Sequence, residues 1–396
     1  MKIYLVGGCV RDKLLGIESK DHDWTVVGAT PADMFKLGYQ QVGKEFPVFI
    51  HPQTKEEYAL ARRETKSGTG YHGFSFDTEN VTLEDDLWRR DITINAMAID
   101  ENNKLIDPFG GQNDLANKII RHVSAHFEED PLRVLRIARF AAKLNFSVHS
   151  TTIALMRQMV INGELRYLTP ERINIEITKA LSSDRPSIFF RVLQDCGALD
   201  AVFPELQQHF ETSLLALDFI SITSNKISVR FATLCYHFGN ISGIDALKIF
   251  CSRIKCSREI TQLSLKVCEN YHLFADALVL NAEKILHLLT SLRAINNPEI
   301  FNDFLLCCQS IAQSVDQSID PFVDPSVDPK LRLCKQKDFL QLLLCRIIHL
   351  PLKHLSMKYS DRALGEAIKK ERILEIKKCQ EMYIDSAEKA VSKINY

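Results

Sequence analysis

The chain has 396 residues, 46% of them hydrophobic, which is enough to bury the cores of two or more domains. Its formal net charge of −1 excludes a protein that holds nucleic acid by bulk positive charge, so any RNA contact must come from local basic patches. The apolar runs are too short for a membrane span or a secretory signal, so we expect neither. The eleven cysteines are scattered and include no Cys-x-x-Cys pair, which indicates reduced thiols and a cytoplasmic location.

The first predicted elements are a strand, a glycine turn and a helix. Residues 2–6 are mostly apolar and predict a short buried strand, and a helix is expected from Arg11 onward. Between them lie Gly7 and Gly8, whose backbone N–H groups can approach a phosphate closely, with added positive potential from the helix N-terminus. A turn of this kind is more often only structural. From the turn alone, Gly8 and Arg11 are therefore no more than candidate phosphate-binding residues.

Two carboxylates, Asp21 and Asp23, follow in a segment, residues 21–27, that predicts a second strand. Side chains two residues apart on a strand point to the same face, roughly 7 Å from each other. Two carboxylates held in this way can bind a pair of Mg²⁺ ions about 4 Å apart, the arrangement used for in-line nucleotidyl transfer. Asp21 and Asp23 are therefore the candidate catalytic and metal-binding residues.

The remaining chain divides into a mixed part and a helical part. Short β-like runs, among them residues 94–99, alternate with turns through about residue 125, and helical periodicity dominates beyond Asp130. We therefore predict an α+β fold, with a catalytic head over residues 1–139, a helical neck over 140–205, and a helical body and tail over 206–396.

The helix expected after Asp130 carries a row of arginines. Asp130 is suited to cap this helix. Arg133, Arg136 and Arg139 recur every three residues, which places them within about 120° on one face. Such a row is commonly a solvated face, but next to a phosphate site guanidinium groups bind phosphate with bidentate geometry. We expect Arg136 and Arg139 to reach a triphosphate.

Asp130 and Arg133 also suit the recognition of a nucleobase. Cytosine and adenine present an exocyclic amine beside an unprotonated ring nitrogen, whereas uracil and guanine present a carbonyl beside an N–H. A carboxylate can accept from the amine while an arginine donates to the ring nitrogen. The pair would therefore select C and A, although a capped helix with an internal salt bridge is the alternative explanation.

In this order, the motifs resemble the signature of the polymerase-β-type nucleotidyltransferases. More narrowly, they are similar to the bacterial group that contains tRNA nucleotidyltransferases, or CCA-adding enzymes, and poly(A) polymerases. The resemblance covers roughly the first 205 residues. The segments that carry it are Gly7–Asp12, Asp21–Asp23, Asp85–Met97, Asp107–Gly111, Glu129–Arg133 and Leu168–Arg172.

The resemblance implies a polymerase-β-like head with a small mixed sheet, followed by an all-helical neck, body and tail. It implies that Arg90 and Asp91 contact the ribose and the triphosphate, that Asn95 orients the sugar, and that Asp130 and Arg133 act as a protein template for the incoming base. The last motif, residues 168–172, is expected to position the neck and not to take part in catalysis.

The implied activity is addition of the 3′-terminal CCA to tRNA from CTP and ATP, with Mg²⁺ as cofactor and release of pyrophosphate, by a monomer or weak dimer whose body and tail hold tRNA. The alternatives are a poly(A) polymerase, an enzyme that adds only A, and a non-catalytic RNA-binding relic. Poly(A) polymerases tend to end in a strongly basic extension, whereas residues 361–396 hold eight basic and seven acidic residues. Relatives often carry a His-Asp phosphohydrolase in the body, but in residues 232–239 His237 is followed by Phe238, which indicates a degenerate site.

Overall fold

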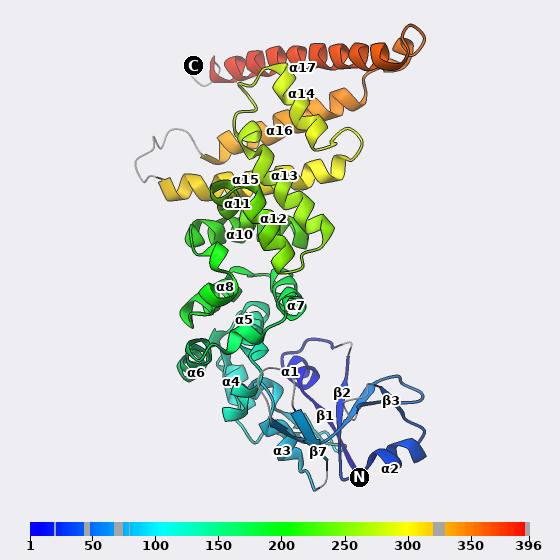
Figure 1. The fold of residues 1–396 in the computed structure, drawn as a ribbon, viewed down its shortest axis with the longest axis vertical. Helices are drawn as coiled ribbons and strands as arrows, with labels where there is room; N and C mark the ends of the chain where they lie inside the picture. The colour runs from blue at the N-terminus through cyan, green and yellow to red at the C-terminus, as the bar shows by residue number, and fades with distance from the viewer. Residues whose placement is uncertain (20, 43–47, 67–73, 79, 320–328, 393–396) are drawn as a thin grey trace. The chain divides into compact units, whose positions relative to one another are not determined.

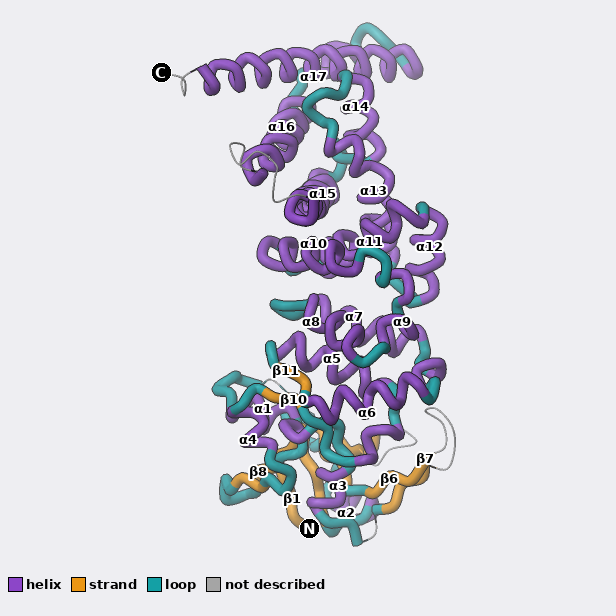
Figure 2. The backbone as a smooth tube through the Cα atoms, turned by 90° about the vertical axis from the view of Figure 1, so that its left-hand side faces the viewer, coloured by secondary structure: helices purple, strands orange, loops and turns teal. Residues whose placement is uncertain are grey.

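The computed structural model describes residues 1–19, 21–42, 48–66, 74–78, 80–319 and 329–392. The chain separates into two compact units, Met1–Pro204 and Glu205–Tyr396. All strands of the described residues belong to the first unit, and the regular elements described in the second unit are helices (Figure 1, Figure 2). The predicted α+β class, with a mixed sheet followed by helices, is confirmed.

A seven-stranded mixed sheet occupies the first part of the first unit, in the order β3-β4-β5-β2-β1-β8-β9. Its neighbours are antiparallel except β2 and β5, which run parallel. The two short pairs β6–β7 and β10–β11 lie outside this sheet. The strands are β1 (Lys2–Val6), β2 (Asp23–Val27), β3 (Gln40–Val42), β4 (Val48–Ile50), β5 (Glu57–Leu60), β6 (Arg63–Lys66), β7 (Phe74–Asp77), β8 (Ala98–Ile99), β9 (Leu105–Ile106), β10 (Ile119–Ile120) and β11 (Ser147–Val148).

The two faces of this sheet bury different groups because side chains alternate along each strand. Val26 of β2 packs into a cluster with Met34 of α2 (Pro31–Lys36) and Phe49 of β4. On the other face, Thr25 donates a hydrogen bond from Oγ1 to Asp86 of α3 at 3.4 Å. Asp23 shares the face of Thr25, so the strand directs its carboxylate to the side on which α3 lies.

Helices complete the first unit. Helix α5 (Leu132–Leu144) packs against α7 and α8. The predicted boundary between head and neck at residues 139 and 140 falls inside α5, so the arginine row and the residues that follow it belong to one helix. The other helices are α1 (Gly8–Leu14), α3 (Leu83–Trp88), α4 (Gly111–Ala116), α6 (Ser150–Ile161), α7 (Pro170–Leu181), α8 (Ser187–Asp195) and α9 (Ala198–Val202), with short 3₁₀ turns at Thr93–Asn95, Ala125–Glu129 and Glu164–Tyr167.

The second unit is built from eight α-helices in the part that is described. Helices α10, α11, α13 and α15 pack against one another, and α14 and α17 pack together. Within the described residues, no helix is both long and apolar enough to cross a bilayer. The helices are α10 (Phe210–Thr223), α11 (Ile227–Ser242), α12 (Ile244–Arg253), α13 (Arg258–Ala275), α14 (Ala282–Ser291), α15 (Pro298–Ile319), α16 (Pro329–Ile348) and α17 (Asp361–Ser392), with 3₁₀ turns at Pro204–Leu206 and Leu352–Leu355.

The segment compared with the phosphohydrolase site lies in α11. His237 is buried, its Nε2 has no hydrogen-bond partner, and its ring stacks on that of His209 with 6.1 Å between centroids. Burial lowers the pKa of His237 to about 4, with a smaller contribution from His209. In the parts of the chain that are described, no group of three or more His, Cys, Asp or Glu side chains is arranged to hold a metal ion.

Candidate active site

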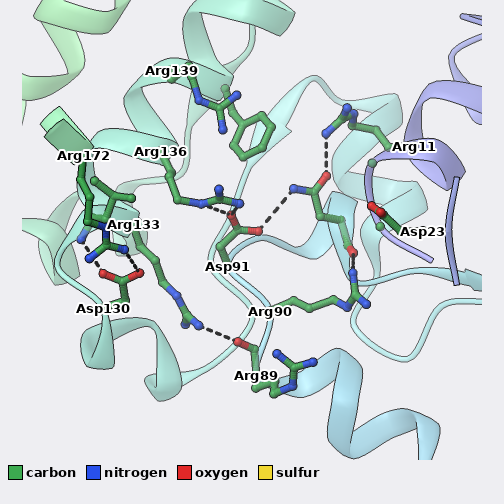
Figure 3. Close-up of a pocket in the computed structure, with 15 residues that line it drawn as sticks. Arg11, Asp23, Arg89, Arg90, Asp91, Asp130, Arg133, Arg136, Arg139 and Arg172 are labelled. Carbon is green, nitrogen blue, oxygen red and sulfur yellow. Dashed lines mark hydrogen bonds and ion pairs between the residues drawn. The ribbon is translucent and has the colours of Figure 1, made fainter. Parts of the chain in front are cut away.

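A cavity of about 510 Å³ in the first unit collects most of the predicted site residues. It brings together the glycine turn, the arginine row of α5, and one of the two candidate metal ligands. Asp130, Arg133 and Arg172 lie on one side of the cavity, Arg11 and Asp23 on the opposite side, and Asp91 between them (Figure 3). The lining residues are Gly7, Gly8, Arg11, Asp23, Arg89, Arg90, Asp91, Asn95, Asp130, Leu132, Arg133, Arg136, Arg139, Phe140 and Arg172.

The glycine turn brings backbone and arginine side chains close together. Gly7 has φ +81°, a conformation that side-chain-bearing residues rarely adopt, and a Cβ atom there would lie 2.9 Å from Nη1 of Arg90. Helix α1 begins at Gly8, so the expectation that it begins near Arg11 was wrong. The earlier start follows from Gly7, whose left-handed φ turns the chain directly from the strand into the helix. Gly8 is therefore in the first turn of α1 and lines the cavity.

Arg11 is almost fully buried at 3% exposure and is held in place by two neighbours. Its Nη1 donates to Oδ1 of Asn95 at 2.6 Å, and its Nε donates to Oδ1 of Asp12 at 2.8 Å. These contacts fix the guanidinium group at the wall of the cavity, so an incoming anion meets an arginine that is already oriented.

Asp21 and Asp23 are placed differently. Strand β2 begins at Asp23, so Asp21 precedes the strand and the prediction of a strand over residues 21–27 was wrong at its start. Pairing with β1 explains this limit, because β1 ends at Val6, opposite Asp23. Both residues are exposed, but Asp23 lines the cavity and Asp21 does not.

The carboxylates of Asp21 and Asp23 nevertheless suit a metal ion. Within the described residues neither carboxylate has a hydrogen-bond or ion-pair partner, although the cavity that Asp23 lines contains seven arginines. Unpaired carboxylate oxygens are the ligands that Mg²⁺ prefers. The donor chemistry of Asp23 therefore fits Mg²⁺, and the role of Asp21 as a second ligand stays a prediction.

Asp91 and Asn95 meet, but not as neighbours on a strand. Thr93–Asn95 is a 3₁₀ turn and β8 is confined to Ala98–Ile99, so the strand expected over residues 94–99 was largely wrong. The turn makes Nδ2 of Asn95 a donor to Oδ1 of Asp91 at 3.3 Å.

Arg90 is anchored by a buried carboxylate outside the cavity lining. Its Nη2 donates to Oδ2 of Asp86 at 3.1 Å, and Arg89 binds the other oxygen of the same carboxylate. Asp86 is 1% exposed. Burial tends to raise the pKa of Asp86, but the charges of Arg89 and Arg90 outweigh burial and hold this pKa below its ordinary value. Asp86 therefore stays ionised and orients both arginines.

Asp91 holds Arg136 in the middle of the cavity. Its Oδ2 accepts a hydrogen bond from Nε of Arg136 at 2.9 Å, while its Oδ1 accepts from the backbone N–H of Ile92 at 3.0 Å. Burial opposes ionisation, but the charge and hydrogen bonds of Arg136, the charge of Arg133 and the hydrogen bond of Asn95 lower the pKa of Asp91 to about 2. The carboxylate is therefore a fixed anion that positions the guanidinium group of Arg136 at the cavity.

Asp91→Asn should destabilise the first unit by roughly 3 kcal/mol at neutral pH, because it leaves the guanidinium of Arg136 without its buried counter-charge. A lowered folded-state pKa stabilises the protein above the unfolded pKa, and that contribution is lost as pH falls. Urea unfolding should therefore show a gap between wild type and variant that is constant above about pH 5 and narrows as pH falls from about 4 toward 2. A gap independent of pH would contradict this ionic role.

Phe140 lies among three of the arginines. Its ring centroid is 4.1 Å from Cζ of Arg139, 5.5 Å from that of Arg11 and 5.6 Å from that of Arg136. Arg139 also forms an ion pair with the buried carboxylate of Glu176 in α7. An aromatic face attracts cations, so the ring offsets part of the repulsion between these guanidinium groups.

Phe140→Leu should raise the KM for the nucleoside triphosphates that the motif resemblance implies as substrates by about fivefold with little change in kcat, because about 1 kcal/mol of cation–π attraction that orients the arginines is removed. Phe140→Tyr retains the aromatic face and should restore the KM. Steady-state kinetics of the two variants measure this split. Equal loss in both would indicate that Phe140 serves only to fill space.

Asp130 and Arg133 are both held by groups outside the pair. Helix α5 begins at Leu132, one residue later than predicted, with Pro131 before it. Asp130 still makes the expected hydrogen bond to the helix start, since its Oδ1 accepts from the backbone N–H of Leu132 at 3.0 Å, and its Oδ2 accepts from Nη2 of Arg172 at 2.8 Å. Arg133 donates to the carbonyl oxygens of His126 at 2.7 Å and Arg89 at 2.8 Å. The two side chains therefore reach the cavity wall in orientations set by their neighbours.

Arg89, Phe140 and Arg172 are among the lining residues that were not identified as site residues from the sequence. Arg172 was assigned a purely positioning role in the neck; Thr169 does cap α7, but this helix also directs Arg172 into the cavity. Arg89 was overlooked beside Arg90, although the doubled arginine was a signal. Phe140 follows Arg139 directly but does not share the three-residue spacing of the arginines. That spacing therefore did not identify Phe140 as a site residue.

Comparisons with known protein families agree with this geometry. A model of the poly(A) polymerase head domain matches residues 3–121. A second model, described as a probable RNA and SrmB-binding site of polymerase A, matches residues 145–210. The resemblance stated from the motifs is confirmed, and the first unit has the head of a nucleotidyltransferase.

Solved structures match nearly the whole chain. A CCA-adding enzyme with ATP has a TM-score of 0.66 and 21% identity over 100% of this chain and 90% of its own. A Thermotoga maritima CCA-adding enzyme complexed with tRNA has a TM-score of 0.63 and 20% identity, over 98% of this chain and 91% of its own. A structure described as a tRNA-processing enzyme complex has a TM-score of 0.64 and 25% identity, over 95% and 97%. The fold is therefore that of these enzymes in both units.

Proposed function

We propose that this chain, which belongs to the nucleotidyltransferases with the poly(A) polymerase type of head domain, adds the 3′-terminal CCA to tRNA from CTP and ATP and releases pyrophosphate. The observation that carries the proposal is the order of groups along one cavity. Asp130 and Arg133 lie at one side, Asp91 and Arg136 in the middle, and Arg11 and Asp23 at the other side (Figure 3). A nucleoside triphosphate has the same order of base, sugar and phosphates.

Base selection falls to Asp130 and Arg133. An ionised carboxylate has about four lone-pair sites, so Asp130 can accept from an exocyclic amine in addition to Leu132 and Arg172. The ion pair with Arg172 orients that carboxylate, whose oxygens act only as acceptors. Arg133 donates to the adjacent ring nitrogen, with its guanidinium plane fixed by two main-chain carbonyls. Uracil and guanine would place an N–H against the donors of Arg133 and a carbonyl against the carboxylate of Asp130, so neither hydrogen bond could form.

The triphosphate is bound at the opposite side of the cavity. Backbone N–H groups and positive charge surround it, supplied by Gly8, Arg11, Arg90, Arg136 and Arg139. The buried carboxylates of Asp86, Asp91 and Glu176 hold Arg90, Arg136 and Arg139, respectively, in position. Mg²⁺ held by Asp21 and Asp23 would supply Lewis-acid activation of the RNA 3′-hydroxyl and charge stabilisation of the pyrophosphate. Preorganised charge and positioning suffice without a covalent enzyme intermediate.

The tRNA would be bound by the second unit as well as by the helices after α5. The structural relative with bound tRNA matches this chain over both units, which supports this assignment. A poly(A) polymerase is the nearest alternative, because it shares the motifs of the head.

The test is nucleotide addition to three tRNA transcripts, ending before the CCA, after its second C, and complete, each with Mg²⁺ and CTP, ATP or both. Product length is measured at single-nucleotide resolution. Addition of C, C and A followed by a stop is the expected result. Long A tracts without C would indicate a poly(A) polymerase, A added only after the second C would indicate a divided task, and no addition to any transcript would overturn the proposal.

A further inference from the structure

A second cavity, of about 310 Å³, lies between α14 and α17 of the second unit. The two helices lie side by side at this point (Figure 1, Figure 2). Basic and hydroxyl side chains predominate among its polar lining, against a single carboxylate, Glu283. The lining residues are Glu283, Leu286, His287, Thr290, Gly365, Ile368, Lys369 and Arg372.

Arg372 has no ion pair with a carboxylate of the described residues, in contrast to Arg136 and Arg139 of the active site. Its Nε is buried and has no hydrogen-bond partner in the described part of the chain. Burial lowers the pKa of Arg372, whereas the charge of Asp91 raises the pKa of Arg136 against the effect of burial. A buried guanidinium nitrogen without a partner is costly, and this cost is recovered if an anion occupies the cavity.

Gly365 lines the cavity without a side chain. It lies inside α17, where glycine costs about 1 kcal/mol relative to alanine, and no positive φ is required there. A Cβ atom built at Gly365 would meet no atom within 4 Å. Neither backbone conformation nor close packing therefore explains the glycine, and its effect is to leave space one turn before Ile368 and Lys369.

We propose that this cavity binds a phosphate group through Arg372, Lys369 and Thr290. An arginine fork can grip two phosphate oxygens, a lysine adds a point charge, and a threonine hydroxyl donates a further hydrogen bond. The phosphate can come from the RNA backbone or from a small phosphate compound, since both present the same oxygens. The RNA source rests on the proposed function, whereas the cavity and its chemistry do not.

The experiment uses the full chain, a tRNA transcript without CCA, and no nucleotide. Arg372→Gln should weaken transcript binding by about fivefold at low salt and reduce the slope of log K against log[salt] by about 1, as expected for one lost phosphate contact. Gly365→Leu should do the same by filling the cavity without changing charge. In parallel, inorganic phosphate should raise the Tm of wild type, but not of either variant, relative to chloride at equal ionic strength.

The matched control is Arg362→Gln, which removes one charge from the same helix at a side chain that is 94% exposed and does not line the cavity. Loss of transcript affinity in both variants but not in this control supports the RNA source. Loss of only the phosphate-induced shift supports a small phosphate compound. The proposal is overturned if both variants match the control in both measurements, or if Arg372→Gln has an effect that Gly365→Leu lacks. A chain that binds the transcript but adds no nucleotide would refute the proposed function alone.

Discussion

Asp23→Asn should lower kcat for nucleotide addition by at least about 10³-fold while leaving the fold and the affinity for CTP and ATP nearly unchanged. The amide retains the size of the carboxylate but not its charge. Asp23 is the cavity carboxylate that has no ion-pair partner in the described residues, so no internal pair is broken by this change. Single-turnover kinetics on a tRNA transcript without CCA, together with nucleotide binding in the absence of tRNA, measure the two effects.

The control for this variant is Glu18→Gln, an exposed carboxylate shortly before Asp21 that does not line the cavity. It should leave kcat unchanged. Asp21→Asn tests the proposed second ligand separately, because Asp21 does not line the cavity. Full activity of Asp23→Asn would refute the catalytic role, and full activity of Asp21→Asn alone would leave Asp23 as the single ligand from this motif.

Arg133→Met should reduce the preference for CTP over UTP by at least about 10²-fold, from a discrimination that can approach 10⁴ when buried hydrogen-bonding groups are left unpaired by the wrong base. Methionine retains an unbranched apolar stem but cannot donate to a ring nitrogen. The ratio of kcat/KM for CTP and UTP on the transcript without CCA measures this loss.

Arg136→Gln is the matched control, one turn along the same helix. Arg136 faces Asp91 in the middle of the cavity and not the groups at its base-selecting side, so its loss should lower addition of every nucleotide by a similar factor. The base preference should then be unchanged. A parallel decline of CTP and UTP in Arg133→Met would show that Arg133 supports the cavity wall through its bonds to two carbonyls and does not select the base.

Local sequence rules correctly predicted features that depend only on contacts between residues close together in the chain. The cap at Asp130 and the cap at Thr169 are formed by backbone N–H groups two or three residues away. The row Arg133, Arg136 and Arg139 lines one cavity because helical geometry alone places residues at this spacing on one face. The predictions were wrong where a neighbouring strand decides where a strand begins, as at Asp21. They were also wrong at Asn95, where a 3₁₀ turn replaced an expected strand.

The sequence by itself determined the order of the motifs, the α+β class and the candidate chemistry of two carboxylates and an arginine row. The tertiary structure decided how the arginines are held: Asp86 supports Arg90, Asp91 supports Arg136, and Glu176, 37 residues away in sequence, supports Arg139. It also decided that Arg172 and Phe140 belong to the site. Helical period and capping act over one or two turns and are readable in a single segment, whereas ion pairs between distant segments depend on packing that no local pattern specifies.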